Sequence, residues 1–257
     1  ACRAHRQKCS LIATENAMPA APAPPFFGAI AAASPEGFDA AILGAPHGTP
    51  YPGIDNKPHQ TAPDAFRLAL AEDAHFLDSW DFDLGQTPLG NGIKLCDLGN
   101  LKTRSKDGEA NRRLIEEKTR EILNAGAVPI LFGGDDSVPI PFLAAYAEQP
   151  PIVILQIDAH IDWREEREGE RFGFSSTMRR ASEHGHVWRI VQCGMRGIGS
   201  AREGEVRDAL AWGARIVTAR DIHHGGIARV LDHIPEDCDC VICLDCDAID
   251  ISQMPAV

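Results

Sequence analysis

The stretch that decides the fold is PIVILQIDAHIDWR, residues 151–164. Its first half is apolar, as expected for a strand that is buried on both faces. Its second half places Asp158, His160 and Asp162 at every second position, and alternate residues of a strand point to the same side. We therefore expect a buried strand that carries two carboxylates and an imidazole to one side of its carboxyl end.

Similar apolar runs alternate with helical patterns along most of the chain. Runs that are apolar on both faces and alternate with helices are typical of a parallel sheet that is covered on both sides, which is an α/β fold. In such sheets, ligands bind beyond the carboxyl ends of the strands. The predicted strands are residues 38–46, 93–98, 128–134, 151–158, 188–196, 214–220 and 239–247, and the predicted helices include 61–77, 109–126 and 138–148.

Composition limits the class of protein. The 257 residues are 44% hydrophobic and 24% charged, with a formal net charge of −12, and this length suits one large or two small domains. The acidic balance argues against a nucleic-acid or anionic-membrane partner. No apolar run reaches the ~18–20 residues of a membrane helix. The eight cysteines lie mostly in apolar, strand-like runs, so we expect reduced thiols and a cytoplasmic location.

The two ends of the chain differ from its middle. Residues 1–36 are rich in Ala and Pro, which predicts a flexible N-terminal arm that packs little. We expect one α/β domain over residues 37–257. Because the chain starts at Ala1 rather than Met and stops at Val257, soon after its last acidic cluster, we expect it to be part of a longer protein, truncated at the C-terminus.

Three acidic clusters each follow an apolar strand, and we expect them to meet at one edge of the sheet. They are FGGDDS with Asp135 and Asp136, DAHID at residues 158–162, and LDCDAID with Asp245, Asp247 and Asp250. Crowded carboxylates raise one another's pKa, and burial raises it further, so bound cations are the simplest compensation. Oxygen ligands with an imidazole suit Mn²⁺ or a similar ion, and two ions ~3.5–4 Å apart would use this many ligands.

These clusters, in this order, resemble those of the ureohydrolase family of arginases and agmatinases, in its agmatinase-like branch. The family pattern runs Gly-Gly-Asp-His-Ser, then Asp-Ala-His-x-Asp, then Asp-x-Asp-x-x-Asp. GAPHGT (44–49), TMRRA (177–181) and VQCGMRG (191–197) are also similar to family segments. The resemblance implies a three-layer α/β/α sandwich with a mainly parallel sheet, two Mn²⁺ ions per subunit, and a homo-oligomer, either a trimer or a hexamer.

The resemblance also implies a reaction, the hydrolysis of a small guanidino compound to urea and an amine. Agmatine is the first candidate substrate, followed by guanidinobutyrate or a related guanidino acid. Asp158 and Asp245 would bridge the ions, and a hydroxide between the ions would attack the guanidinium carbon. Asp162 would be catalytic, orienting the hydroxide and passing a proton to the leaving amine. The implied metal ligands are Asp136, Asp158, His160, Asp162, Asp245 and Asp247.

The chain departs from the family pattern in three places. Asp136 replaces a ligating His, which adds one negative charge and implies either a weakened first metal position or a functional variant. Phe174 stands where many relatives carry a His, and Ser175 and Ser176 beside it are candidate substrate-binding residues. A C-terminal loop, with a Glu that grips the guanidinium in relatives, is absent from the chain.

Other interpretations stay open beside the ureohydrolase. The protein could be a non-catalytic metal-binding subunit of an oligomer, or a hydrolase of a related amidine or formimino compound. Arg179 and Arg180 are either a solvated or subunit-facing pair, or they bind a substrate carboxylate. Four cysteines close together in the sequence could form a metal site or could be buried thiols. We favour buried thiols, because residues of an extended strand point to opposite sides and these side chains would not converge. They are Cys238, Cys240, Cys243 and Cys246.

Overall fold

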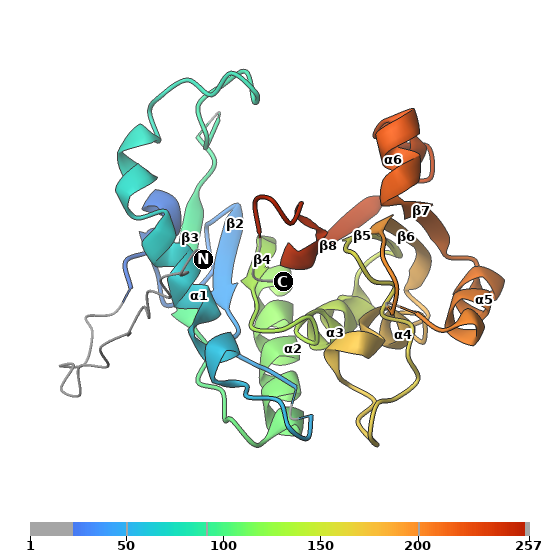
Figure 1. Cartoon of the computed structure of the whole chain (residues 1–257). Helices are drawn as coiled ribbons and strands as arrows, with labels where there is room; N and C mark the ends of the chain where they lie inside the picture. Colours follow the sequence, from blue (N-terminus) through green and yellow to red (C-terminus); the bar gives the residue numbers. More distant parts are fainter. Residues whose placement is uncertain (1–22, 50, 91, 200, 255–257) are drawn as a thin grey trace, which may run out of the picture.

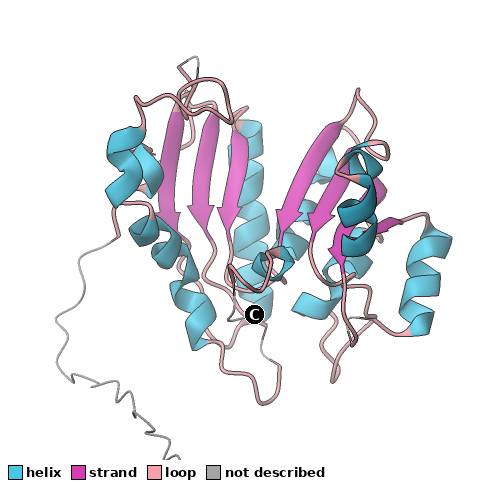
Figure 2. Ribbon diagram, turned by 45° about the horizontal axis from the view of Figure 1, so that its top comes forward, coloured by secondary structure: helices cyan, strands magenta, loops and turns pink. Residues whose placement is uncertain are grey.

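The computed structural model describes residues 23–49, 51–90, 92–199 and 201–254. These residues form two four-stranded sheets with the orders β1-β3-β2-β4 and β7-β6-β5-β8, and every strand pair in both is parallel. The strands are β1 (Ile30–Ala31), β2 (Ala40–Gly44), β3 (Leu95–Asn100), β4 (Val128–Phe132), β5 (Ile152–Ile157), β6 (Val187–Met195), β7 (Arg215–Thr218) and β8 (Asp239–Leu244). In Figure 2 the strand arrows of both sheets point toward the same side of the molecule.

Helices cover both faces of the sheets, as the doubly apolar strands predict (Figure 1). In the second sheet, Ile154 packs with residues of α3, α4 and α5 on one face, and Val153 packs beside Val230 of α7 on the other. The α/β fold is therefore confirmed. The helices are α1 (Lys57–Ala69), α2 (Gly108–Asn124), α3 (Pro139–Ala144), α4 (Thr177–Ala181), α5 (Glu203–Trp212), α6 (Ala219–Gly225) and α7 (Ala228–Leu231).

The expectation of one sheet needs a correction, because no ladder bonds join β4 to β8 in the described residues. The backbone N–H of Val128 donates to the backbone carbonyl of Asp39, which directly precedes β2. The nitrogen of the next residue, Pro129, therefore points away from β2, toward the edge of β4 that has no ladder partner. Proline lacks an N–H and is tolerated at a sheet edge. The three acidic clusters consequently follow strands of two sheets, namely β4 in the first and β5 and β8 in the second.

The predicted helices and the predicted arm differ from the structure mainly at their boundaries. The helix expected over 61–77 is α1, which starts earlier, followed by a short 3-10 helix at Glu72–Phe76. Most of the predicted arm, residues 1–22, lies outside the described residues. Within the rest of it, Ile30–Ala31 pairs with β3 as strand β1. None of the helices in the described part of the chain combines the length and the apolar character that crossing a bilayer requires.

A buried ion pair joins α1 to the first sheet. Arg67 donates from Nε to Oδ2 of Asp97 at 2.7 Å and from Nη2 to Oδ1 at 2.8 Å, and both side chains are 3% exposed. Burial raises the pKa of Asp97, but bonds from Arg67 and from two backbone N–H groups outweigh this and leave it below its usual value. The pair therefore contributes stability at neutral pH that is lost as the pH falls through the lowered pKa.

Arg67→Met is expected to lower the free energy of unfolding by about 3–5 kcal/mol, because it leaves the Asp97 carboxylate buried without a partner. Denaturant unfolding at neutral pH measures this, and the loss should shrink in acid. Arg113→Met is the matched control, since Arg113 and its partner Glu109 are each 71% exposed. That variant should change stability by no more than about 0.5 kcal/mol. Equal losses from both variants would contradict the assigned role of the buried pair.

Candidate metal centre

Each acidic cluster begins with an aspartate that closes a turn just past the end of a strand. The first aspartate accepts a hydrogen bond from the backbone N–H two residues later, which is the turn that Asp favours. These bonds run from Ser137 N to Asp135 Oδ1 at 3.0 Å, from His160 N to Asp158 Oδ1 at 2.6 Å, and from Asp247 N to Asp245 Oδ1 at 2.9 Å. The chain therefore leaves the strand before the remaining acidic residues of each cluster.

The prediction that residues 158–162 continue the strand, with Asp158, His160 and Asp162 pointing to one side, is therefore wrong. Strand β5 ends at Ile157, and Asp162 has a φ of 44°, a left-handed conformation that is rare for a residue with a side chain. The turn brings Asp162 back toward Asp158, while the His160 side chain contacts a different strand's cluster. Left-handed backbone in residues other than glycine is often found at functional sites.

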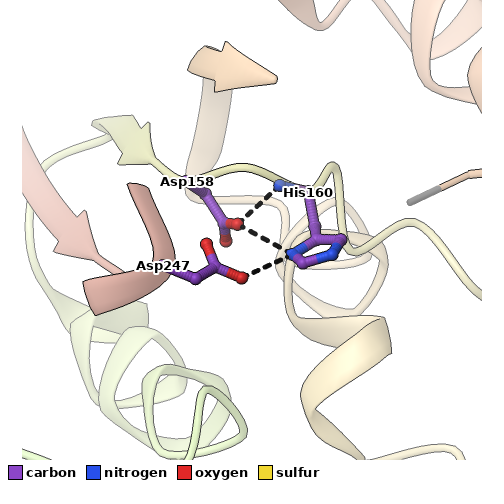
Figure 3. Close-up of side chains that lie close together, drawn as sticks. All are labelled: Asp158, His160 and Asp247. Carbon is purple, nitrogen blue, oxygen red and sulfur yellow. Dashed lines mark hydrogen bonds and ion pairs between the residues drawn. The ribbon is translucent and has the colours of Figure 1, made fainter. Parts of the chain in front are cut away.

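One group that could hold a metal ion joins Asp158, His160 and Asp247, each offering a ligand atom within 4.8 Å of the others (Figure 3). His160 Nδ1 lies 2.7 Å from Asp247 Oδ2 and 3.5 Å from Asp158 Oδ1. Hydrogen bonding to Asp158 and Asp247 raises the pKa of His160 to about 10. Without metal the imidazole is therefore protonated between two carboxylates, in the place where a cation would replace that proton.

A second group joins Asp136, Asp158 and Asp162 within the same 4.8 Å. Burial, and then the charge of nearby aspartates, raises the pKa of Asp136 and of Asp162 well above its usual value. Asp136 Oδ2 is buried and has no hydrogen-bond partner among the described residues. The three acids are crowded and buried, and one oxygen of Asp136 has no donor, so a divalent cation would supply the stabilisation that their charges need.

The two groups share Asp158, which is what a bridging ligand requires. Asp245, the other expected bridge, lies in neither group of the described residues. Burial first, and then Asp158 and Asp247, raises the pKa of Asp245 to about 6, although the Asp247 N–H bond opposes this. Its charge acts on Asp136, so it belongs to the same electrostatic cluster. The assignment of all six side chains as ligands stays a prediction.

Gln156, which was not among the candidate residues predicted from the sequence, places its side-chain amide beneath this cluster. Gln156 Nε2 donates to Asp158 Oδ2 at 2.6 Å and to Asp162 Oδ2 at 2.8 Å. One signal was available, because Gln156 is the only polar side chain of β5 and precedes Asp158 by two residues. A lone amide in a buried strand needs partners, and the nearest acids on its own face could supply them.

The turn at residues 174–177 places Phe174, Ser175 and Ser176 beside the GAPHGT loop and the second group. The Phe174 ring contacts Tyr51 edge-on with 4.9 Å between centroids, and Thr177 Oγ1 donates to the carbonyl of Asp136. Ser176 is buried and its Oγ has no hydrogen-bond partner among the described residues. Substrate binding by Ser175 and Ser176 remains a prediction.

The described residues bear on two of the remaining alternatives. Neither metal-binding group includes a cysteine, and the six described cysteines are free thiols. Of the four clustered cysteines only Cys243 is buried, so the expectation of buried strand thiols is wrong for the exposed Cys240. Arg179 and Arg180 both contact Glu165 Oε2, at 2.8 and 3.0 Å. The Arg180 side chain is buried, so the solvated alternative is wrong for this residue, whereas Arg179 is 34% exposed. The subunit-facing and substrate-binding alternatives stay predictions.

Comparison with known proteins assigns the chain to a family, since the model of the arginase family matches residues 38–257. The chain belongs to the arginase family. It is 28% identical to the human mitochondrial guanidino acid hydrolase, over 86% of this chain and 62% of that protein. It is 27% identical to mitochondrial agmatinase of Gallus gallus, over 86% of this chain and 65% of that protein. The chain thus spans less than two thirds of the length of these relatives.

Solved structures of this family share the fold of the chain. Proclavaminate amidino hydrolase from Streptomyces clavuligerus matches with a TM-score of 0.75 and 24% identity, covering 91% of this chain and 77% of that one. Agmatine ureohydrolase of Thermoplasma volcanium matches with a TM-score of 0.70 and 23% identity, covering 87% and 72%. These likenesses confirm the arginase-like fold.

Proposed function

We propose that this protein uses two Mn²⁺ ions to hydrolyse a guanidino compound to urea and an amine. The observation that carries the proposal is the pair of acid-rich groups that share Asp158 in a member of the arginase family. The donors fit such ions, because five carboxylates and one imidazole form a set that manganese accepts and thiolate-loving ions do not favour. Two bound ions would supply an acidified water as the nucleophile near neutral pH.

Charge supports a cationic substrate for this site. The six proposed ligands include five aspartates, so two divalent ions leave one negative charge uncompensated. A histidine at position 136, as in the family pattern, would make the same set neutral. Asp136 therefore favours binding of a guanidinium group next to the ions, although it makes the bound water less acidic.

Asp162 has the position that the proposed proton transfers need. It belongs to the second group, and its Oδ2 is held by Gln156, so its carboxyl orientation is fixed. From there it would orient the nucleophile, accept its proton and deliver that proton to the leaving amine.

The names of the relatives guide the choice of substrate. They include an agmatinase, a guanidino acid hydrolase, and an N(1)-aminopropylagmatine ureohydrolase from Thermus thermophilus that is 32% identical over 76% of this chain. We propose agmatine first and a guanidino acid such as guanidinobutyrate second. We also propose a trimer or hexamer in the cytoplasm, where the six described thiols would stay reduced.

The test is urea release by Mn²⁺-loaded protein across a panel of guanidino compounds, with bound metal counted in parallel. Turnover of one compound with two ions per chain supports the proposal and names the substrate. Two ions with ammonia or formamide release from amidine or formimino compounds, and no urea, would redirect the function to those substrates. One ion without turnover would favour the non-catalytic metal-binding subunit that Asp136 and Phe174 suggest. No ion and no turnover would mean that Asp136 has broken the metal site.

A further inference from the structure

We propose that Gln156 and Gln192 form a positioning relay that holds Asp158 and Asp162 in the orientation required for metal binding. This inference rests on the proposed function, because it assumes that these two carboxylates hold an ion. The glutamines contact neither substrate nor metal in this proposal. They act through the aspartates, from the layer of the sheet directly beneath the cluster.

The first step of the relay is a clamp. Gln156 is 1% exposed, and its amide nitrogen uses both hydrogens on carboxylates, with bonds of 2.6 Å to Asp158 Oδ2 and 2.8 Å to Asp162 Oδ2. One NH₂ group therefore sets the spacing of two acids that would otherwise repel each other. Each bond uses one lone pair of one oxygen, so both carboxylates keep lone pairs for an ion.

The second step fixes which end of the Gln156 amide faces the acids. Gln192 is 0% exposed and donates from Nε2 to Gln156 Oε1 at 2.6 Å and to the carbonyl of Ile161 at 2.7 Å. A flipped Gln156 would place its oxygen against two carboxylates and its NH₂ against that of Gln192. The relay begins and ends within residues 158–162, so it couples the shape of this turn to the carboxylate positions.

Strand register makes the arrangement possible. Gln156 is the β-ladder partner of Gln192 on β6, so the two side chains lie side by side on the same face of the sheet. A neutral amide suits this place, because it orients carboxylates without cancelling their charge. An arginine or lysine would compete with the metal ion, and another acid would add to the repulsion.

The test replaces Gln156 with methionine, which has a similar length and no hydrogen-bonding group. Outer contacts of metal ligands typically contribute 10–100-fold to metal affinity, so Gln156→Met should weaken Mn²⁺ binding by about that factor. Calorimetric titration of chelator-stripped protein measures the affinity, and the electron paramagnetic resonance spectrum of bound Mn²⁺ should also change. The metal-free variant should unfold at a lower temperature than wild type, because it leaves buried oxygens of Asp158 and Asp162 and the NH₂ group of Gln192 with fewer partners. The Mn²⁺ affinity and the spectrum, rather than the unfolding midpoint, therefore decide the inference.

Gln192→Met tests the second step of the relay, because Gln192 touches no carboxylate and acts only through Gln156 and the carbonyl of Ile161. It should weaken Mn²⁺ binding, but less than Gln156→Met does. Wild-type Mn²⁺ affinity in Gln192→Met would contradict the relay, and this result decides the inference if Gln156→Met does not fold. Unchanged affinity with a lower unfolding midpoint would assign the amides a purely structural role and overturn the relay. Wild-type protein that binds no Mn²⁺ would overturn the proposed function itself. Wild type and variant that bind two ions with equal affinity would overturn only the relay.

Discussion

Asp158→Ala is expected to remove both of the proposed metal ions and to abolish the proposed hydrolysis. Asp158 is the one residue common to the two groups, so its loss takes a carboxylate from each position at once. Loss of His160 or Asp136 would affect one group only. Metal content of the purified, Mn²⁺-equilibrated variant, together with urea release on the best wild-type substrate, measures both effects.

Two further variants separate this effect from misfolding. Asp158→Asn keeps the shape and an oxygen that can still accept the His160 N–H bond, but it removes the charge that the ions need. Its NH₂ group would face that of Gln156, so it should fold with lower stability than wild type but less disturbed than Asp158→Ala, and it should still lose most of its metal. Asp250→Ala changes an exposed aspartate of the third cluster that lies outside both groups, and it should retain metal and activity. Wild-type manganese content in Asp158→Ala would refute the assignment of the centre.

The strands and layers could be predicted from the sequence because they depend on which residues avoid water. The run at 151–157 is apolar on both faces, and the structure buries Val153 and Ile154 on opposite sides of β5. The meeting of the acidic clusters could be predicted as well, because parallel strands end on the same side. These inferences need only burial and direction, which hold along the whole length of a strand.

The inner geometry of the centre could not be predicted in this way. The Asx turns end β5 and β8 one residue before the acids, so alternation no longer determines where those side chains point. The left-handed backbone of Asp162 could not be read from the sequence either, because Asp tolerates this conformation but adopts it only occasionally. The proposed role of Gln156 likewise depends on Gln192, which lies 36 positions away in the chain. The spacing of neighbouring residues cannot predict a contact over this distance.

Removing the metal is expected to make the protein less stable as the pH rises. The pKa of Asp245 is raised to about 6, and those of Asp136 and Asp162 lie well above their usual value. For a raised carboxyl pKa, stability is fully present below the ordinary value of about 4 and is lost as the pH rises through the raised one. The pKa of His160 is raised to about 10, so the stability that this residue contributes is lost as the pH rises from about 6.5 to about 10.

For each proton that the metal-free folded state binds in excess of the unfolded state, the free energy of unfolding falls by about 1.4 kcal/mol for every unit by which the pH rises. The chelator-treated protein should therefore unfold at progressively lower temperature from about pH 5 to about pH 8. With excess Mn²⁺ the trend should reverse, because metal binds the deprotonated ligands and displaces those protons. Stabilisation by the metal reaches about 4 kcal/mol at a thousandfold excess over Kd. Parallel pH profiles with and without Mn²⁺ would mean that these carboxyl groups do not bind the ion, because metal binding to them must release protons.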